Sequence, residues 1–138
     1  MAVTELHTFG WNKELDLKPR IEEGVGEEIT KTATRYDSAD FISPSYVIEL
    51  KSRRKYDKKG KLVTSQTYET YLLPVCKANA ACVDKELLFL YYFEGDNTLH
   101  YLVYDAELFD TFHQERPTWH PTGQLHWYVP REAFTLLE

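Results

Sequence analysis

The sequence has only two cysteines and lacks any apolar segment long enough to cross a membrane. No apolar run approaches the ~20 residues that a transmembrane helix needs, and the first residues lack the basic and apolar regions of a secretory signal. Cys76 and Cys82 lie six positions apart in an alanine-rich segment that we expect to be helical, where this spacing directs them to different faces. We therefore expect no disulfide, no membrane partner and an intracellular protein of the cytoplasm or nucleus.

The chain also lacks an overall positive charge, since its formal net charge is -6. This argues mildly against a nucleic-acid partner, because the phosphate backbone favours cationic surfaces. The charge is unevenly distributed, however: the segment from Lys51 to Lys61 contains seven basic residues and one acidic residue. One face can therefore be strongly positive on an acidic protein, although a solvated lysine-rich loop explains this feature equally well.

Disorder and multiple domains are excluded by composition and length. Hydrophobic residues make up 43% of the chain and aromatic residues 14%, which suffices for a packed interior. The 138 residues fit one domain, which we expect to span residues 1–138.

The order of periodic segments and turn signals predicts an α/β sandwich around a mixed sheet with helices on its faces. A helix is expected over 15–34 and a second helix after Pro74, because proline is favoured at helix starts. The expected strands cover 34–42, 46–53, 63–71, 87–93, 98–104 and 124–129, and residues 106–112 are expected to form a helical turn.

The segment from Tyr46 to Lys51 carries the strongest chemical signal. Alternate side chains of a strand share a face, so Glu49 and Lys51 point the same way. A simple ion pair on a half-exposed strand would explain this pair. The preceding strand, however, supplies a second carboxylate, from either Asp37 or Asp40.

The turn at Ser43-Pro44-Ser45 decides which aspartate joins Glu49. A three-residue turn puts Asp37 on the face of Glu49, and a four-residue turn puts Asp40 there. A shift of one residue exchanges the two faces of a strand, so a regular hairpin permits only one of these choices. The sequence alone leaves both open.

Two carboxylates and a nearby lysine are the groups that metal-assisted phosphodiester hydrolysis requires. Acidic oxygens hold Mg²⁺ or Mn²⁺, and the ion polarises the phosphoryl group and lowers the pKa of a bound water. A lysine then orients that water or stabilises the developing negative charge. The backbone carbonyl of Leu50 would add a further oxygen ligand.

These residues resemble a known superfamily. Asp40, eight intervening residues and then Glu49-Leu50-Lys51 after an apolar lead-in resemble the PD-(D/E)XK nucleases, and the Glu-Leu-Lys-Ser-Arg form looks like their small phage and viral members. Ala39 stands where the name-giving proline would be. The resemblance covers roughly residues 20–105, leaves 106–138 as a C-terminal extension and implies a restriction-endonuclease-like core.

The resemblance implies an endonuclease that hydrolyses phosphodiester bonds in DNA, with RNA as an alternative substrate and a homodimer as one arrangement. Asp40, Glu49 and Lys51 would be catalytic. The metal would be held by Asp40, Glu49, the Leu50 carbonyl and a glutamate of the first helix, Glu28 or Glu27. The nucleic acid would be bound by Arg53, Arg54, Lys55, Lys58, Lys59 and Lys77. Two other readings stay open: a catalytically inactive nucleic-acid-binding member of the same fold, and a viral or phage protein-interaction module.

Overall fold

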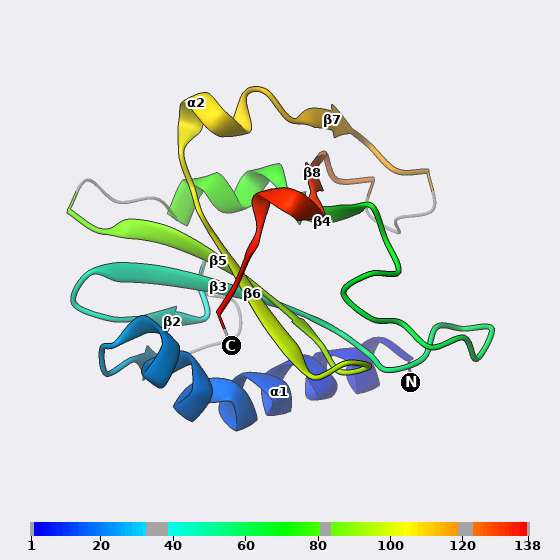
Figure 1. The fold of residues 1–138 in the computed structure, drawn as a ribbon, viewed down its shortest axis with the longest axis horizontal. Helices are drawn as coiled ribbons and strands as arrows, with labels where there is room; N and C mark the ends of the chain where they lie inside the picture. Colours follow the sequence, from blue (N-terminus) through cyan, green and yellow to red (C-terminus); the bar gives the residue numbers. More distant parts are fainter. Residues whose placement is uncertain (1, 33–38, 81–83, 119–122, 138) are drawn as a thin grey trace.

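The computed structural model describes residues 2–32, 39–80, 84–118 and 123–137 (Figure 1). They form a six-stranded sheet and a three-stranded sheet, together with one long helix and several short ones. The elements, in chain order, are α1 (Ala2–Val25), β1 (Thr30–Lys31), β2 (Phe41–Ile42), β3 (Tyr46–Arg53), β4 (Thr70–Pro74), the 3-10 helix η1 (Val75–Ala80), β5 (Glu86–Phe93), β6 (Thr98–Val103), α2 (Ala106–Phe109), β7 (His113–Glu115), β8 (His126–Pro130), the 3-10 helix η2 (Arg131–Ala133) and β9 (Thr135–Leu136).

The first helix starts and ends earlier than the sequence predicts. The helix α1 begins at Ala2, in a segment that shows no clear period, and it stops at Val25 instead of continuing to residue 34. Gly26 explains the stop, because its φ of 80° lies in the left-handed region that ends helices. Leu17 and Ile21 of α1 are buried. No helix in the described part of the chain is long and apolar enough to cross a membrane.

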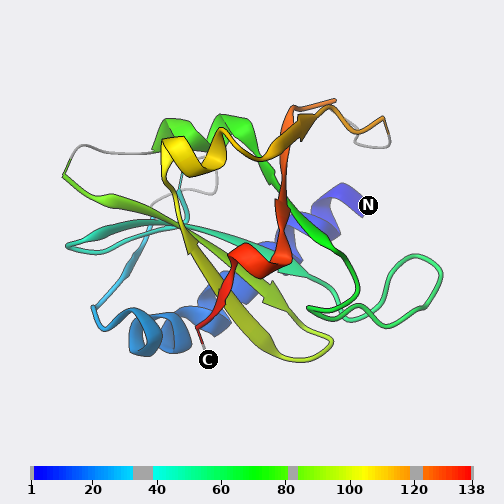
Figure 2. The same cartoon turned by 45° about the horizontal axis from the view of Figure 1, so that its top comes forward.

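The larger sheet has the order β1-β2-β3-β5-β6-β9. Strands β3 and β5 are parallel, and the other neighbours are antiparallel, so the prediction of an α/β fold with a mixed sheet is confirmed. The predicted hairpin of residues 87–93 and 98–104 is also confirmed, as β5 and β6. The parallel pair requires a crossover, which β4 and η1 provide on one side of the sheet (Figures 1 and 2).

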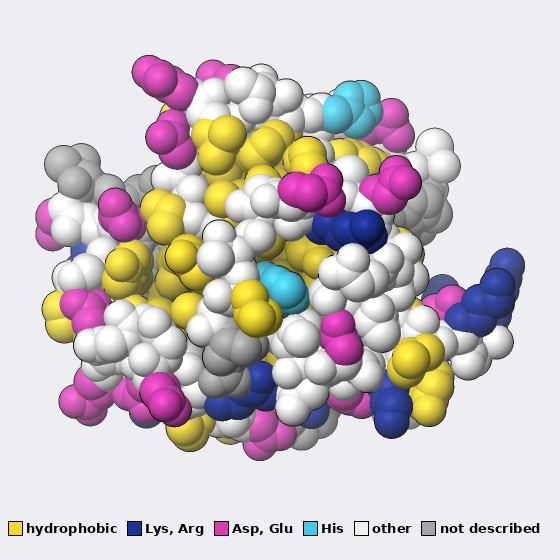
Figure 3. Space-filling model, viewed as in Figure 1, with side chains coloured by type: hydrophobic (Ala, Val, Ile, Leu, Met, Phe, Trp, Pro, Cys, Tyr) yellow, Lys and Arg dark blue, Asp and Glu magenta, His cyan; other side chains and the backbone are white. Residues whose placement is uncertain are grey.

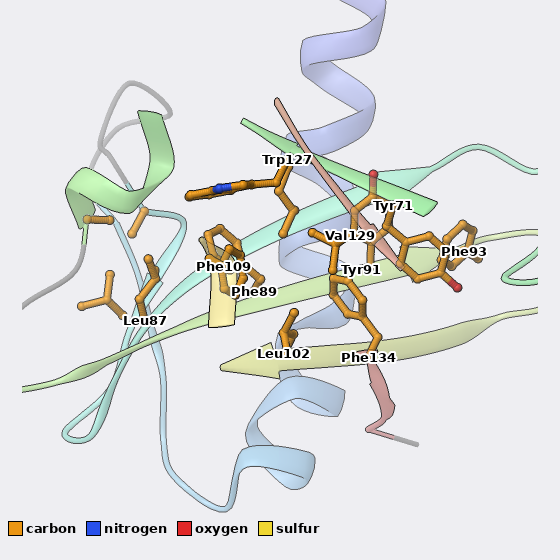
Figure 4. Close-up of a cluster of buried hydrophobic side chains, with 14 of the residues drawn as sticks. Tyr71, Leu87, Phe89, Tyr91, Phe93, Leu102, Phe109, Trp127, Val129 and Phe134 are labelled. Carbon is orange, nitrogen blue, oxygen red and sulfur yellow. The ribbon is translucent and has the colours of Figure 1, made fainter. Parts of the chain in front are cut away.

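Strand alternation divides the core into two clusters on opposite faces of the larger sheet. On one face Ile48, Leu50 and Leu90 pack with Leu17 and Ile21 of α1. The opposite face forms an aromatic cluster with the second sheet (Figure 4), to which Tyr71, Phe89, Tyr91, Phe109 and Trp127 belong. Because Val47 belongs to this second cluster, Glu49 and Lys51 also point toward the second sheet and away from α1.

The third predicted strand, over residues 63–71, is wrong. The strand in this region is β4, which begins at Thr70 and pairs with β8 in the smaller sheet. Residues 64–67 instead form a turn in which the Thr67 amide donates to the Thr64 carbonyl, and the Thr64 amide donates to the Thr67 hydroxyl. The threonine-rich composition is typical of a strand, but here the local hydrogen bonds of the threonines replace the bonds between strands.

The segment after Pro74 is a 3-10 helix over residues 75–80, not the α-helix that we expected. Cys76 on this helix is a free, exposed thiol, and Cys82 lies outside the described residues. The C-terminal part contributes strands to both sheets, since β8 pairs with β4 and β9 pairs with β6.

Candidate active site

The turn between β2 and β3 selects Asp40 as the partner of Glu49. The pairs are Phe41 with Ile48 and Ile42 with Val47, and the Ser43 amide donates to the Tyr46 carbonyl at 2.9 Å. Only Pro44 and Ser45 lie beyond this contact, so the loop is shorter than either length that the sequence suggested. Its even length nevertheless directs Asp40 to the face of Glu49. Asp37 lies outside the described residues.

Glu27 braces this turn and is not in the acidic cluster. Its carboxylate accepts hydrogen bonds from the Ser43 hydroxyl at 2.8 Å and from the amide and hydroxyl of Ser45 at 3.0 and 2.6 Å. The bonds from Ser45 and Ser43 lower the pKa of Glu27. Glu28 is exposed in the segment between α1 and β1. The expectation that Glu28 or Glu27 supplies the helix carboxylate is therefore corrected.

Glu14 of α1 takes that position instead. Its carboxylate hydrogen-bonds with Asp40 and pairs with Lys31, whose Nζ lies 2.9 Å from Oε2. Burial and the neighbouring Asp40 raise the pKa of Glu14 to about 8. The sequence contains a signal for this residue, because Glu14 lies three and seven positions before the buried Leu17 and Ile21 and so shares their helix face.

Asp40, just before β2, is hydrogen-bonded to the backbone of β3. Its Oδ2 accepts a hydrogen bond from the Leu50 amide at 2.8 Å, and its own amide donates to the Ile48 carbonyl at 2.8 Å. The amide and carbonyl of a strand residue point to the same side, so the Leu50 carbonyl also faces this edge. β2 begins at Phe41, opposite Ile48, so among the described residues no strand pairs with β3 beyond Ile48 on the Asp40 side.

Glu49 is nearly buried, with 13% of its side chain exposed. Its Oε1 lies 3.1 Å from Nζ of Lys77, which η1 brings in from the second layer. Its Oε2 is buried and has no hydrogen-bond partner among the described residues. Burial, together with the charge of Asp40, raises the pKa of Glu49 to about 7, against the opposing effect of Lys77 and Lys51. A simple exposed pair of Glu49 and Lys51 does not describe this arrangement.

Lys51 shares this site. Burial and the nearby Arg53 lower the pKa of the Lys51 ammonium, and the attraction of Glu49 offsets part of that effect. For Lys77, burial opposes the charge, but the contact with Glu49 outweighs it and the pKa is raised. Asp40 thus connects two charged groups: Glu14 and Lys31 on the side of α1, and Glu49, Lys51 and Lys77 on the side of the second sheet.

The basic residues after Lys51 differ in exposure: the Arg53 side chain packs against the protein, and the others are exposed to solvent. Arg53 lies over the rings of Tyr68 and Tyr91, 5.7 and 5.9 Å from their centres, and it donates to the Tyr91 hydroxyl at 3.3 Å. The Arg53 side chain is therefore directed into the protein more than the sequence suggested. The remaining predicted nucleic-acid contacts in this segment are exposed: Arg54, Lys55, Lys58 and Lys59.

Within the described ranges, no three His, Cys, Asp or Glu side chains form a ready metal-binding group. Any ion here would depend on fewer carboxylates together with backbone oxygens and water. No protein-family model, no curated protein and no solved structure matches the chain.

Proposed function

We propose that the protein is a metal-dependent endonuclease with a restriction-endonuclease-like core of the PD-(D/E)XK type. The observation that carries the proposal is the position of Asp40 opposite Glu49 on the edge of β3, with Lys51 two residues further along the same face. Metal-assisted phosphodiester hydrolysis needs this combination of carboxylates and a cation. The partly buried setting of these charges also suits a functional site, because perturbed pKa values concentrate at such sites.

The residues fit a Mg²⁺ or Mn²⁺ ion. Oε2 of Glu49 is a buried oxygen without a hydrogen-bond partner in the described part of the chain, and a cation would supply that partner. Asp40 and the Leu50 carbonyl would complete the protein ligands. Mg²⁺ usually keeps several waters and takes one or two carboxylates, so a third carboxylate in direct contact is not required. A bound ion would polarise the phosphoryl group and lower the pKa of a coordinated water.

The other charged residues then have distinct tasks. The Lys51 ammonium is positioned to stabilise negative charge on the phosphoryl oxygens or to hold the attacking water. Its lowered pKa reflects partial desolvation, which strengthens such a contact. Glu14, hydrogen-bonded to Asp40, orients that carboxylate from the opposite side of the sheet edge.

DNA is the proposed substrate, with RNA as the alternative. The support is the exposed basic segment that leaves the end of β3, which would meet the phosphate backbone on one side of the cut. A compact chain of 138 residues has little surface for reading a long sequence, and a homodimer would double it.

The direct test is incubation of supercoiled plasmid with the protein and either Mg²⁺, Mn²⁺ or a chelator. We expect nicking that requires the metal and falls at least a hundredfold in Glu49→Gln and Lys51→Met. Glu28→Gln and Lys18→Met serve as matched controls, because these side chains lie outside the cluster and should leave nicking unchanged. Metal-independent cutting, or equal cutting by Glu49→Gln, would exclude the proposed mechanism.

One observation favours a second candidate, a nucleic-acid-binding member of the same fold without catalysis. Lys77 already neutralises one oxygen of Glu49 without any metal, as a structural ion pair would. This candidate predicts that the wild type binds DNA with the same affinity in Mg²⁺ and in chelator and cuts no form of it. The plasmid assay combined with a binding titration separates the two candidates.

A further inference from the structure

A small hairpin, here called the finger, runs from Lys55 to Val63 and projects beyond the end of β3 (Figures 1 and 2). Its two strands are joined by hydrogen bonds from the Val63 amide to the Lys55 carbonyl at 2.8 Å and from the Asp57 amide to the Lys61 carbonyl at 2.9 Å. Only Arg54 separates the finger from Arg53, the last residue of β3, so the strand that carries Glu49 and Lys51 leads into the finger.

The tip of the finger is held in one conformation by its own turn. Oδ1 of Asp57 accepts hydrogen bonds from the amides of Lys59 and Lys61 at 2.8 and 2.9 Å. The Gly60 amide donates to the Asp57 carbonyl at 3.0 Å, and Gly60 has a φ of 80°, as a three-residue hairpin loop requires. Asp57, the single acidic residue of the finger, thus accepts hydrogen bonds from the backbone of its own turn.

The base of the finger is fixed to the protein. Val63 is buried, and its carbonyl passes so close to Gly95 that a Cβ at that position would lie 1.9 Å from the oxygen. Two residues further along, Ser65 donates from its hydroxyl to Asp96 at 2.6 Å and from its amide at 3.1 Å. The finger is therefore anchored on the β5–β6 turn at its return strand and on β3 at its outgoing strand.

Two apolar side chains stand together on the exposed finger. Tyr56 and Leu62 are directly opposed, and they are 56% and 49% exposed. The hydrogen bonds lie on the pairs before and after them, so Tyr56 and Leu62 form the non-hydrogen-bonded type of pair, in which side chains come closest. Nζ of Lys55 lies 5.6 Å from the Tyr56 ring centre, and three further lysines of the finger, Lys58, Lys59 and Lys61, are exposed.

The space-filling view shows Lys and Arg side chains with hydrophobic atoms beside them on this projection (Figure 3). An exposed aromatic pair among lysines fits single-stranded nucleic acid, whose bases stack on aromatic rings while its phosphates contact the lysines. It fits an intact duplex poorly, because the base faces of a duplex are stacked on one another. It also fits an apolar protein surface poorly, because docking there would bury four ammonium groups.

The number of residues between Lys51 and Tyr56 limits the distance from the candidate active site to the finger. Tyr56 follows Lys51 by five residues, and a strand advances about 3.3 Å per residue, so the finger meets the substrate within about 16 Å of the cut. Along a duplex, which rises about 3.4 Å per base pair, this distance corresponds to about five base pairs.

We propose that the finger binds unpaired bases next to the cleavage position, through stacking on Tyr56 and contact with Leu62, and that the substrate class is branched or partly single-stranded nucleic acid. This inference rests on the proposed nuclease function. It extends that function by naming the feature of the substrate that the protein recognises.

The test compares binding of a forked duplex, a blunt duplex and a single strand of the same sequence, by fluorescence anisotropy of the full chain carrying Glu49→Gln to prevent cutting. Stacking contributes about 1 to 3 kcal/mol per base, so Tyr56→Ala should weaken binding of the fork and single strand by about tenfold or more. Binding of the blunt duplex should be unchanged. Tyr56→Phe keeps the ring and should behave as the parent chain.

The double variant Lys58→Ala/Lys59→Ala is the matched electrostatic control. It should weaken all three substrates alike and flatten the dependence of binding on salt. Circular dichroism of each variant verifies folding. Equal preference for the fork in Tyr56→Ala and in the parent would overturn the finger proposal while plasmid nicking by the wild type still supported the nuclease. Absence of both binding and nicking in the wild type would overturn both.

Discussion

Lys77 places its ammonium 3.1 Å from Oε1 of Glu49, so the 3-10 helix after β4 brings a cation into the acidic cluster from the second layer of the fold. The sequence predicted Lys77 as a nucleic-acid contact, whereas in the structure its ammonium pairs with Glu49. In the proposed function, a metal ion bound at Oε2 of Glu49 would be repelled by the Lys77 ammonium at Oε1.

Removal of this cation should strengthen metal binding. We expect Lys77→Met to raise the affinity for Mn²⁺ at least tenfold. Unit charges about 4 Å apart interact by about 4 kcal/mol at an effective dielectric constant near 20, and solvent screening of the partly exposed Lys77 reduces this value. The measurement is calorimetric titration with Mn²⁺ at about pH 9, because the loss of Lys77 raises the pKa of Glu49 further above about 7. Lys77→Arg, which keeps the charge, is the control. An affinity that falls in Lys77→Met would contradict the repulsion.

The carboxylate of Glu14 should matter and that of Glu28 should not. Outer partners of metal ligands typically change affinity or activity by about 10- to 100-fold, so Glu14→Leu, which removes the hydrogen bond to Asp40, should slow plasmid nicking by that factor. Glu28→Leu, on the exposed segment after the same helix, should leave the rate unchanged. The comparison is made by single-turnover kinetics with both proteins at equal concentration. Equal rates for Glu14→Leu and the wild type would remove Glu14 from the site.

The raised pKa of Glu49 predicts how stability changes with pH in the absence of metal. Its pKa rises from 4.5 to about 7 on folding, so the protonated form stabilises the protein below about pH 4.5, and this stabilisation is lost as the pH rises through 7. Glu49→Gln lacks this loss. Between pH 5 and 8 the variant should therefore gain on the order of 1 to 2 kcal/mol relative to the wild type, after allowance for solvent screening.

Denaturant unfolding in chelator at several pH values measures this difference. The control is Glu28→Gln, whose free energy of unfolding should follow the wild type at every pH. Added Mn²⁺ should reverse the trend for the wild type alone, because metal binding requires the ionised carboxylate. A constant difference between Glu49→Gln and the wild type across the pH range would show that Glu49 is ionised throughout.

Gly95 should tolerate no side chain. A Cβ there would lie 1.9 Å from the backbone oxygen of Val63, so Gly95→Ala must displace the return strand of the finger. We expect a loss of about 1 to 3 kcal/mol in the free energy of unfolding, the usual range for overpacking. Gly24→Ala is the contrasting variant, because its Cβ would meet only the movable side chain of Leu137 and should cost less. Thermal unfolding of both variants makes the comparison, and equal losses would argue against a fixed finger base.

The sequence predicted those parts of the site that depend on local geometry. Alternation along a strand suffices to put Glu49 and Lys51 on one face, and the structure has them there. The choice between Asp37 and Asp40 depended on one turn, which Glu27 holds through hydrogen bonds from Ser43 and Ser45. No pattern in the turn sequence itself records those bonds.

The parts that the sequence did not predict depend on contacts between distant segments. Glu14 was overlooked because the first dozen residues show no helical period, although the helix face of Leu17 and Ile21 includes it. The placement of β4 in a second sheet depends on its pairing with β8, more than fifty residues later. The contact of Lys77 with Glu49 follows from that crossover and has no local signal.

A crystal structure of the wild type soaked in Mn²⁺, with the ion located by its anomalous scattering, tests the central claim most directly. The proposed function predicts one ion bound by Asp40 and by Oε2 of Glu49, the oxygen that Lys77 leaves without a partner. An ion bound elsewhere, or no ion on Asp40 and Glu49 at saturating Mn²⁺, would contradict it.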